Sequence, residues 1–268
     1  MSKVTLDGIT VGYTDEGSGE PLVLVHGHPF DRSMWHPQVA HFSRQGWRVI
    51  VPDLRGYGES TVVPGLTTLE TFARDIAHLL EHLGVGHHVI GGLSMGGQIV
   101  MEYYRLFPDR VRALLLADTF AAGETEHGKK VRNDTADRVL REGMEGYATE
   151  LLPGMVAQRT LEAMPEVAAH VLGMMRRTSS AGAAAALRGR AERRDYVDML
   201  ARICVPTLVV VGSADEFTPV SDARLIQERI PDATLAIVDG VGHMPNLERP
   251  GEFNAAFEKL LHSLPRTA

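Results

Sequence analysis

The stretch Gly91-Gly92-Leu93-Ser94-Met95-Gly96-Gly97 determines how the rest of the chain is interpreted. It contains the spacing Gly92-x-Ser94-x-Gly96, with an apolar pair before it and a helical pattern after it. A serine on a sharp turn between a strand and a helix has a strained backbone, so its close neighbours must lack a Cβ atom. Such a turn aims the serine Oγ out of the sheet, and the helix N-terminus favours negative charge beside it. We therefore interpret Ser94 as a nucleophile, with a plain glycine-rich turn as the alternative.

Short apolar runs alternate with helical patterns on both sides of this turn. Strands that are apolar at every position are buried on both faces, as in a parallel sheet covered by helices. The alternation predicts an α/β fold with a mostly parallel, eight-stranded sheet. Asp7-Gly8, between the first two runs, is typical of a two-residue hairpin turn. The expected strands are Val4–Leu6, Ile9–Tyr13, Pro21–Val25, Arg48–Val51, His88–Ile90, Ala113–Ala117, Thr207–Val211 and Thr234–Val238.

One long segment, Thr119–Met199, breaks this alternation. It has no β-branched apolar run and is helical in pattern throughout. We expect residues 1–118 and 200–268 to form one α/β core, with residues 119–199 as a helical lid inserted after the sixth strand. The alternative is an ordinary set of packing helices. The helices expected in the core are Leu69–Leu83, Met95–Phe107, Ser221–Ile230 and Asn246–Leu261.

Composition argues against a disordered, collagenous or coiled-coil chain. The 268 residues are 44% apolar and 23% charged, which is ordinary globular usage. The net charge of −7 disfavours a nucleic-acid surface, which would carry a basic excess. No apolar run has signal-peptide length or approaches the roughly 18–20 residues that span a bilayer. We expect a soluble cytoplasmic protein with no membrane or nucleic-acid partner, and the sequence leaves a homo-oligomer open.

Two later loops supply partners for Ser94. A serine nucleophile needs a general base, which a histidine oriented by a carboxylate provides in the chain order Ser, acid, His. Asp215 follows one expected strand and His243 follows the last one. The carboxyl ends of parallel strands meet at one edge of the sheet, where chemistry collects. We predict Ser94 as nucleophile, His243 as base and acid, and Asp215 as the group that orients His243. Asp118 also ends a strand at this edge, and its alternative role is a helix N-cap.

A developing oxyanion needs N–H donors. The residue after the nucleophile supplies one, the backbone N–H of Met95, and we assign the other to the backbone N–H of His28. His28 could instead be a second catalytic base or a metal ligand. His26 is expected to be buried and to brace this loop through hydrogen bonds. We expect neither a cofactor nor a metal ion.

The lid region is rich in methionine, which suits an adaptable apolar pocket. These methionines could equally fill the core of the lid itself. The candidate pocket residues are Met144, Met155, Met164, Met174 and Met175, with Phe30, Trp35 and Phe120 at the entrance.

Two other features receive structural interpretations. The basic run Arg188, Arg190, Arg193 and Arg194 is predicted to be a solvated helix face balanced by nearby acids. The single cysteine, Cys204, precedes a strand and is expected to be buried and inert.

Together these motifs resemble the α/β-hydrolase superfamily over about 4–118 and 205–261, and most closely its esterase, enol-lactonase and cofactor-free haloperoxidase or perhydrolase branch. The resemblance implies an enzyme, a serine hydrolase that cleaves an ester or lactone of a small, largely apolar substrate through an acyl-enzyme. Hydrolysis of a C–C bond and perhydrolysis are alternatives that use the same residues, and a non-catalytic ligand receptor is a third. A serine nucleophile departs from the dehalogenase and epoxide hydrolase pattern, and His28 stands where relatives often have a bulky apolar residue. The motifs are His26-Gly27-x-Pro29, Asp53-x-Arg55-Gly56-x-Gly58-x-Ser60, Gly92-x-Ser94-x-Gly96-Gly97, Gly212-x-x-Asp215 and Gly242-His243.

Overall fold

A computed structural model describes residues 2–265. These residues form an eight-stranded sheet in the order β1-β2-β4-β3-β5-β6-β7-β8. The β1–β2 and β2–β4 pairs are antiparallel and the other pairs are parallel, as the sequence predicts for a mostly parallel sheet. The strands are β1 (Ser2–Leu6), β2 (Ile9–Glu16), β3 (Glu20–Val25), β4 (Trp47–Pro52), β5 (His88–Leu93), β6 (Val111–Ala117), β7 (Thr207–Gly212) and β8 (Ala233–Val238).

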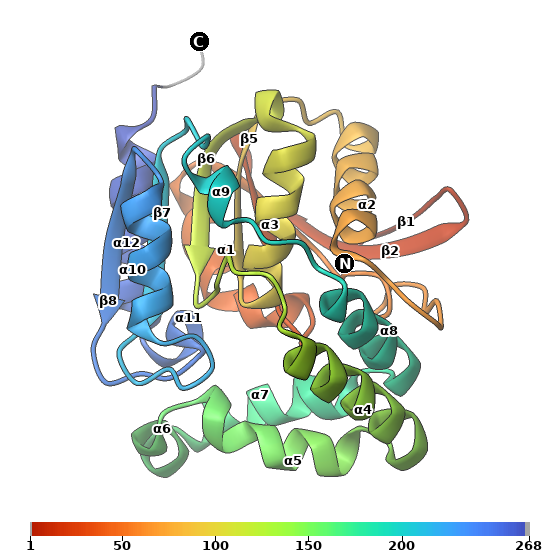
Figure 1. The fold of residues 1–268 in the computed structure, drawn as a ribbon. Helices are drawn as coiled ribbons and strands as arrows, with labels where there is room; N and C mark the ends of the chain where they lie inside the picture. The colour runs from red at the N-terminus through yellow and green to blue at the C-terminus, as the bar shows by residue number, and fades with distance from the viewer. Residues whose placement is uncertain (1, 266–268) are drawn as a thin grey trace.

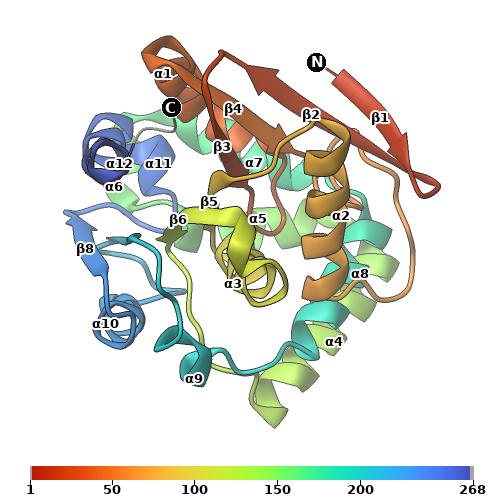
Figure 2. The same cartoon turned by 90° about the horizontal axis from the view of Figure 1, so that it is seen from above.

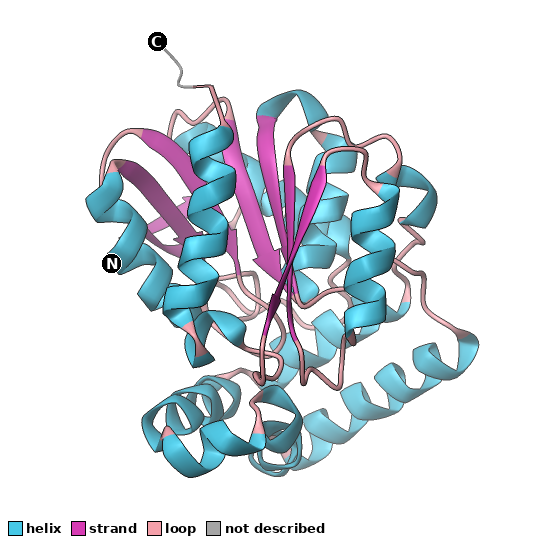
Figure 3. Cartoon of the chain, turned by 90° about the vertical axis from the view of Figure 1, so that its left-hand side faces the viewer, coloured by secondary structure: helices cyan, strands magenta, loops and turns pink. Residues whose placement is uncertain are grey.

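Helices cover both faces of this sheet (Figures 2 and 3). The side chains of α2, α3 and α10 join one buried apolar cluster, and those of α1 and α12 join a second. The sheet therefore has a covered face on each side, which explains why its central strands are apolar at every position. The helices outside the long insertion are α1 (His36–Phe42), α2 (Leu69–His82), α3 (Met95–Leu106), α10 (Val220–Arg229), α11 (Pro245–Glu248) and α12 (Pro250–Ser263), with short 3₁₀ turns at Arg32–Trp35, Ser43–Gln45 and Pro108–Arg110.

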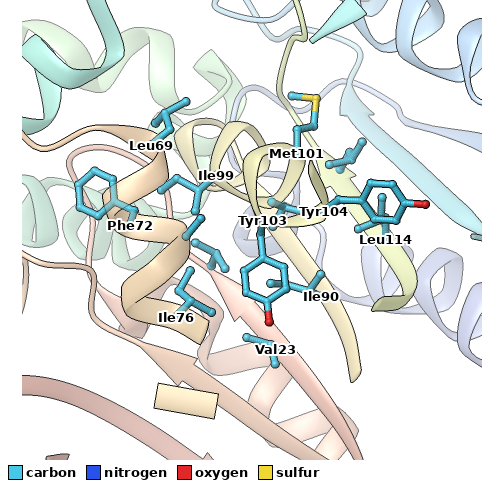
Figure 4. Close-up of a cluster of buried hydrophobic side chains, with 14 of the residues drawn as sticks. Val23, Leu69, Phe72, Ile76, Ile90, Ile99, Met101, Tyr103, Tyr104 and Leu114 are labelled. Carbon is cyan, nitrogen blue, oxygen red and sulfur yellow. The ribbon is translucent and has the colours of Figure 1, made fainter. Parts of the chain in front are cut away.

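The first of these clusters holds α3, the helix that follows Ser94, against the sheet. Figure 4 shows Phe72 and Ile76 of α2 beside Ile99 and Tyr103 of α3. The apolar residues of α2 recur at helical spacing, and the Thr68 hydroxyl caps its first turn by accepting from the N–H of Thr71 at 3.1 Å. This packing fixes the start of α3, and with it the turn that carries Ser94.

The last expected helix, Asn246–Leu261, is wrong as a single element. It is divided into α11 and α12, because Arg249 has φ −140° and ψ 61°, outside the helical region. Pro250 explains the break, since a proline disfavours helical geometry in the residue before it. The expected strands and the other three core helices are confirmed with shifted ends.

Between β6 and β7 the described chain is helical, and α4 to α7 gather at one end of the sheet (Figure 1). Within this segment α4 packs along α8, and α5 packs along α7. The ends of β5, β6 and β7 that carry Ser94, Asp118 and the Asp215 loop face these helices, as the contacts described below show. The bounds of the lid, residues 119–199, remain a prediction, and so does the role of this segment as a lid. The helices are α4 (Glu126–Glu142), α5 (Met144–Met155), α6 (Gln158–Ala163), α7 (Pro165–Arg177), α8 (Ser180–Ala191) and α9 (Val197–Leu200).

Two further observations concern the surface. Cys204 precedes β7, as the sequence predicts, but it is exposed in the loop after α9, so its predicted burial is wrong. Across residues 2–265, no helix combines the length and apolar character that crossing a membrane requires.

Candidate active site

Ser94 occupies the turn between β5 and α3 in a backbone conformation that few residues adopt. Its φ is 58° and its ψ is −119°, and its N–H donates to the carbonyl of Ala117 on β6 at 2.9 Å. A Cβ atom at Gly92 would overlap the backbone of Gly96, and a Cβ at Gly96 would overlap the carbonyl oxygen of Val25. The glycines are therefore required by the close approach of three backbone segments, which is the steric reason expected for this turn.

His243 and Asp215 meet in the loops that follow β8 and β7. The ring Nδ1 of His243 lies 2.7 Å from Oδ2 of Asp215, and both side chains are buried. Asp215 Oδ1 accepts from the N–H groups of Phe217 and Thr218 at 2.8 and 3.1 Å. Burial alone would raise the pKa of Asp215, but the charge of His243 and the donors from Thr218 hold that pKa below its usual value. Asp215 is thus an ionised carboxylate that fixes one ring nitrogen of His243.

Asp118, the competing acid, lies beside Asp215 but has a different environment. Its Oδ1 accepts from the N–H of Gly212 at 2.9 Å, and no hydrogen bond joins it to His243 within residues 2–265. Burial, followed by the negative charge of Asp215, raises the pKa of Asp118 well above its ordinary value. Burial and the charge of Asp215 therefore favour the protonated form of Asp118, while Asp215 carries the charge at the histidine.

The loop after β3 brings His26 and His28 to the start of α3. His26 braces it as expected: its Nε2 accepts from the N–H of Leu54 at 3.0 Å, and its Nδ1 donates to the carbonyl of Gly27 at 2.8 Å. Gly27 lies against Ser94, since a Cβ placed on it would be 3.2 Å from the serine Cβ. In the loops and helix caps described, neither the N–H of His28 nor that of Met95 has a backbone acceptor. The role of these two N–H groups as oxyanion donors remains a prediction.

The side chain of His28 contacts two tyrosines. Its Nδ1 lies 2.7 Å from the hydroxyl of Tyr57, and its Nε2 lies 3.2 Å from the hydroxyl of Tyr147 on α5. Burial, reinforced by the nearby charge of Arg190, lowers the pKa of His28 well below its usual value, so the ring is neutral. Within residues 2–265, the side chains that lie close enough together to hold a metal ion are those of Asp118, Asp215 and His243. His28 is not one of them.

No hydrogen bond joins Ser94 Oγ to the ring of His243 among residues 2–265. Catalytic hydrogen bonds are often long without substrate and shorten when substrate binds. Phe217 packs edge-on against the ring of His243, with centroids 5.4 Å apart, and borders a cavity of about 750 Å³ between the Asp215 loop and α5. The Asp215 and His243 loops are thus in contact with the helices between β6 and β7.

The candidate pocket residues fall into separate places. Phe30, Trp35, Met155, Met174 and Met175 belong to the buried apolar cluster that includes α1 and α12. Met144 packs with Val139 and Leu187 in a small cluster between α4, α5 and α8, and Arg193 stacks over the ring of Phe120 at 4.4 Å. Whether any of them touches a substrate remains a prediction.

The basic run is only in part the solvated face that the sequence predicts, because Arg194 is exposed and Arg188 is half-buried while the other two arginines are buried. Arg190 is only 8% exposed and Arg193 only 6%. Arg193 pairs with Glu124, whereas Arg190 contacts Gln98, its Nε donating to Oε1 at 3.3 Å. Eight of the twelve residues of α8 are alanine or glycine, and nine of the twelve are buried. Arg190 lies on the buried side of this helix, whereas Arg188, two residues earlier, does not. The small, apolar residues around Arg190 are the signal by which its burial could have been found.

Comparison with known proteins agrees with the fold. Residues 20–250 match the family model described as alpha/beta hydrolase fold. The solved structure of a thermophilic esterase from Thermogutta terrifontis, with malate bound, is 38% identical with a TM-score of 0.96 over 100% of both chains. The enol-lactonase from Burkholderia xenovorans LB400 is 26% identical with a TM-score of 0.91, covering 98% of this chain and 100% of that one. 3-Oxoadipate enol-lactonase 2 of Acinetobacter baylyi is 27% identical over 96% of this chain and 95% of its own.

The chain belongs to the α/β-hydrolase family, and its esterase and lactonase relatives place it among the carboxylic-ester hydrolases of that family.

Proposed function

We propose that the protein hydrolyses a carboxylic ester or lactone through Ser94, His243 and Asp215 by way of an acyl-enzyme. The observation that carries the proposal is the buried hydrogen bond between His243 Nδ1 and Asp215 Oδ2, at 2.7 Å, in loops at the same edge of the parallel sheet as the strained Ser94 turn. An ionised Asp215 on Nδ1 requires the ring proton there and leaves Nε2 free as a base.

In the first half of the proposed reaction Ser94 Oγ attacks the carbonyl carbon while Nε2 of His243 takes the hydroxyl proton. The carbonyl oxygen becomes an oxyanion, and the backbone N–H groups of His28 and Met95 donate to it. Asp215 stabilises the imidazolium that has formed. The C–O bond to the leaving group then breaks, and His243 returns the proton to the departing alkoxide, which leaves an acyl group on Ser94.

In the second half His243 removes a proton from water, and the resulting hydroxide attacks the acyl carbonyl. The same two N–H groups hold the second oxyanion. The bond to Ser94 breaks, His243 reprotonates Oγ, and the carboxylic acid leaves. In a lactone both products remain one molecule, a hydroxy acid. This sequence of steps uses side chains, backbone N–H groups and water.

The proposal is tested with Ser94→Ala and short p-nitrophenyl esters. Hydrolysis should fall to the background rate while the circular dichroism spectrum stays that of the wild type, because removing Oγ removes the nucleophile. Ser221→Ala is the matched control, since Ser221 is exposed on α10 and should retain the wild-type rate. Unchanged turnover by purified Ser94→Ala protein would overturn the assignment.

A scan of acyl length and alcohol size on the wild type then defines the substrate. Product analysis with candidate diketones, and with peroxide plus acetate, distinguishes ester hydrolysis from the C–C and peracid reactions that the same residues could perform. We expect the wild-type rate of ester and lactone cleavage to exceed the rates of C–C bond hydrolysis and of peracid formation.

A further inference from the structure

Glu248, the last residue of α11, has a buried side chain that accepts hydrogen bonds from two other segments. The residue is only 2% exposed. Its Oε1 accepts from the N–H of Gly242 at 2.8 Å. Its Oε2 accepts from the N–H of Ala157 at 2.8 Å and from the hydroxyl of Thr160 at 2.5 Å. A buried carboxylate needs such donors to offset the loss of water, and here they join the loop after β8 to the start of α6.

The first of these segments carries His243. Gly242, which donates to Glu248, immediately precedes His243 in the chain. On the other side of Gly242, the carbonyl of Val241 accepts from the N–H of Ala214 at 2.9 Å, which ties the same loop to the loop after β7. The backbone that carries the His243 ring is therefore held from two directions, and Glu248 provides one of the two contacts.

The second segment is the junction between α5 and α6, formed by Val156 and Ala157, and it lies directly against Gly242. A Cβ placed on Gly242 would be 2.8 Å from the nitrogen of Ala157 and 2.9 Å from the carbonyl carbon of Val156. The glycine of the Gly242-His243 motif is thus required because this junction docks on it. Since Glu248 bonds to the same junction, one side chain holds the histidine loop and the inserted helices in a single arrangement.

We propose that Glu248 is a positioning residue for the reaction, which sets the His243 ring for proton transfer by clamping its loop to the α5–α6 junction. The inference rests on the proposed function. Glu248 acts through His243 and not on the substrate. Proton transfer requires the base within hydrogen-bond reach of the serine hydroxyl, and a misplacement of about 1 Å can cost roughly 10²-fold in rate. The inserted helices then influence catalysis, because a movement of the junction reaches His243 through this carboxylate.

The kinetic test uses Glu248→Gln, which keeps the shape of the side chain but replaces one acceptor oxygen with an NH₂ donor. At least one of the two N–H groups then loses its acceptor, and the clamp opens on that side. We expect kcat for a short p-nitrophenyl ester to fall on the order of 10–100-fold, with KM within a few-fold of the wild type. Glu252→Gln is the matched control, since Glu252 is exposed on the first turn of α12 and should retain the wild-type kcat.

A second variant separates the hydrogen bonds of Glu248 from its charge. Thr160→Val removes one of the three donors, leaves the bond to Gly242 in place and changes no charge. Its kcat should fall in the same direction as that of Glu248→Gln, but by less. Thr160→Val also replaces Glu248→Gln if the latter does not fold. A wild-type kcat in folded Glu248→Gln, even with a lower Tm, would show a purely structural role and overturn the proposal.

A spectroscopic readout distinguishes failure of this proposal from failure of the proposed function. The proton on His243 Nδ1 is hydrogen-bonded to Asp215, which moves its NMR signal far downfield. In folded Glu248→Gln this signal should shift or broaden, whereas Glu252→Gln should leave it in place. Such a change supports the positioning role even if Ser94→Ala remains active, in which case only the proposed function fails. An unchanged signal and unchanged kcat, with hydrolysis still dependent on Ser94, would overturn the positioning role alone.

Discussion

Asp118 and Asp215 show how neighbouring residues of one type acquire different charges. Asp215 accepts two backbone N–H groups and faces His243, whereas Asp118 accepts one N–H and faces the negative charge of Asp215. Like charges this close cannot both ionise readily, so one carboxyl keeps its proton. The sequence placed both at the same sheet edge, and only the three-dimensional contacts show which one faces the histidine.

We expect an aspartate-to-asparagine substitution to lower kcat strongly at one of these two residues and little at the other. Asp215→Asn should reduce kcat roughly 10³–10⁴-fold, because an amide facing Nδ1 disfavours the tautomer that leaves Nε2 as the base. Asp118→Asn should keep kcat within a few-fold of the wild type, and steady-state rates on one ester compare them directly. Equal losses in both variants would contradict the assignment of Asp215.

The raised pKa of Asp118 predicts a pH-dependent stability. The folded state keeps a proton that the unfolded chain loses above about pH 4, so this group makes the fold less stable as pH rises from there toward its folded pKa. Asp118→Asn removes that effect, and asparagine tolerates the positive φ of 43° at this position. The Tm of the variant minus that of the wild type should therefore be larger at pH 7 than at pH 4.5. A difference independent of pH would show that Asp118 is ionised in the fold.

Among the elements, helix α8 depends on two glycines for its position. Gly182 and Gly189 lie two turns apart on one face, where Cβ atoms would overlap the carbonyls of Gly56 and Thr67. The N–H of Thr67 also donates to the carbonyl of Ala185 at 3.0 Å. The helix therefore docks backbone to backbone on the loop after β4, which is what buries Arg190.

This docking predicts contrasting effects of two glycine-to-alanine changes. Gly189→Ala should destabilise the protein by about 1–3 kcal/mol, the range for overpacking, because the loop must move. Gly146→Ala on α5 meets no atom within 4 Å and should stabilise it by up to about 1 kcal/mol through helix propensity. Urea unfolding of both variants measures the difference. A neutral Gly189→Ala would mean that α8 is not docked as described.

The elements differ in how far the sequence predicts them. The strands were predictable because burial on both faces makes every residue apolar, and the Ser94 turn because its steric demand specifies glycine by position. The role of α8 was missed because four arginines close in sequence suggest a solvated face, while burial depends on the docking of Gly182 and Gly189. The tyrosines at His28 come from distant segments, and no local pattern connects Tyr57 with Tyr147.

At the scale of the whole molecule, the acidic chain contains a group of three neighbouring arginines. The net charge is −7, yet Arg132, Arg190 and Arg193 lie together with Glu124 as the carboxylate that two of them share. Buried charges are screened much less by salt than exposed ones.

The proposed chemistry also predicts the response to metal removal. Asp118, Asp215 and His243 offer ligand atoms within 4.8 Å of one another, but the Nδ1 and Oδ2 atoms of the last two are joined by a hydrogen bond. Dialysis against EDTA should leave ester hydrolysis within experimental error of the untreated enzyme. Loss of activity that Zn²⁺ or Mn²⁺ restores would show that this group acts as a metal site.

A fluorophosphonate becomes covalently attached to an activated serine, so it shows whether Ser94 is a nucleophile that His243 activates. Mass spectrometry of wild-type protein should locate one adduct on Ser94. The label should be absent from Ser94→Ala and greatly slowed in His243→Ala. An unlabelled Ser94 in folded wild-type protein, or equally fast labelling without His243, would contradict the account.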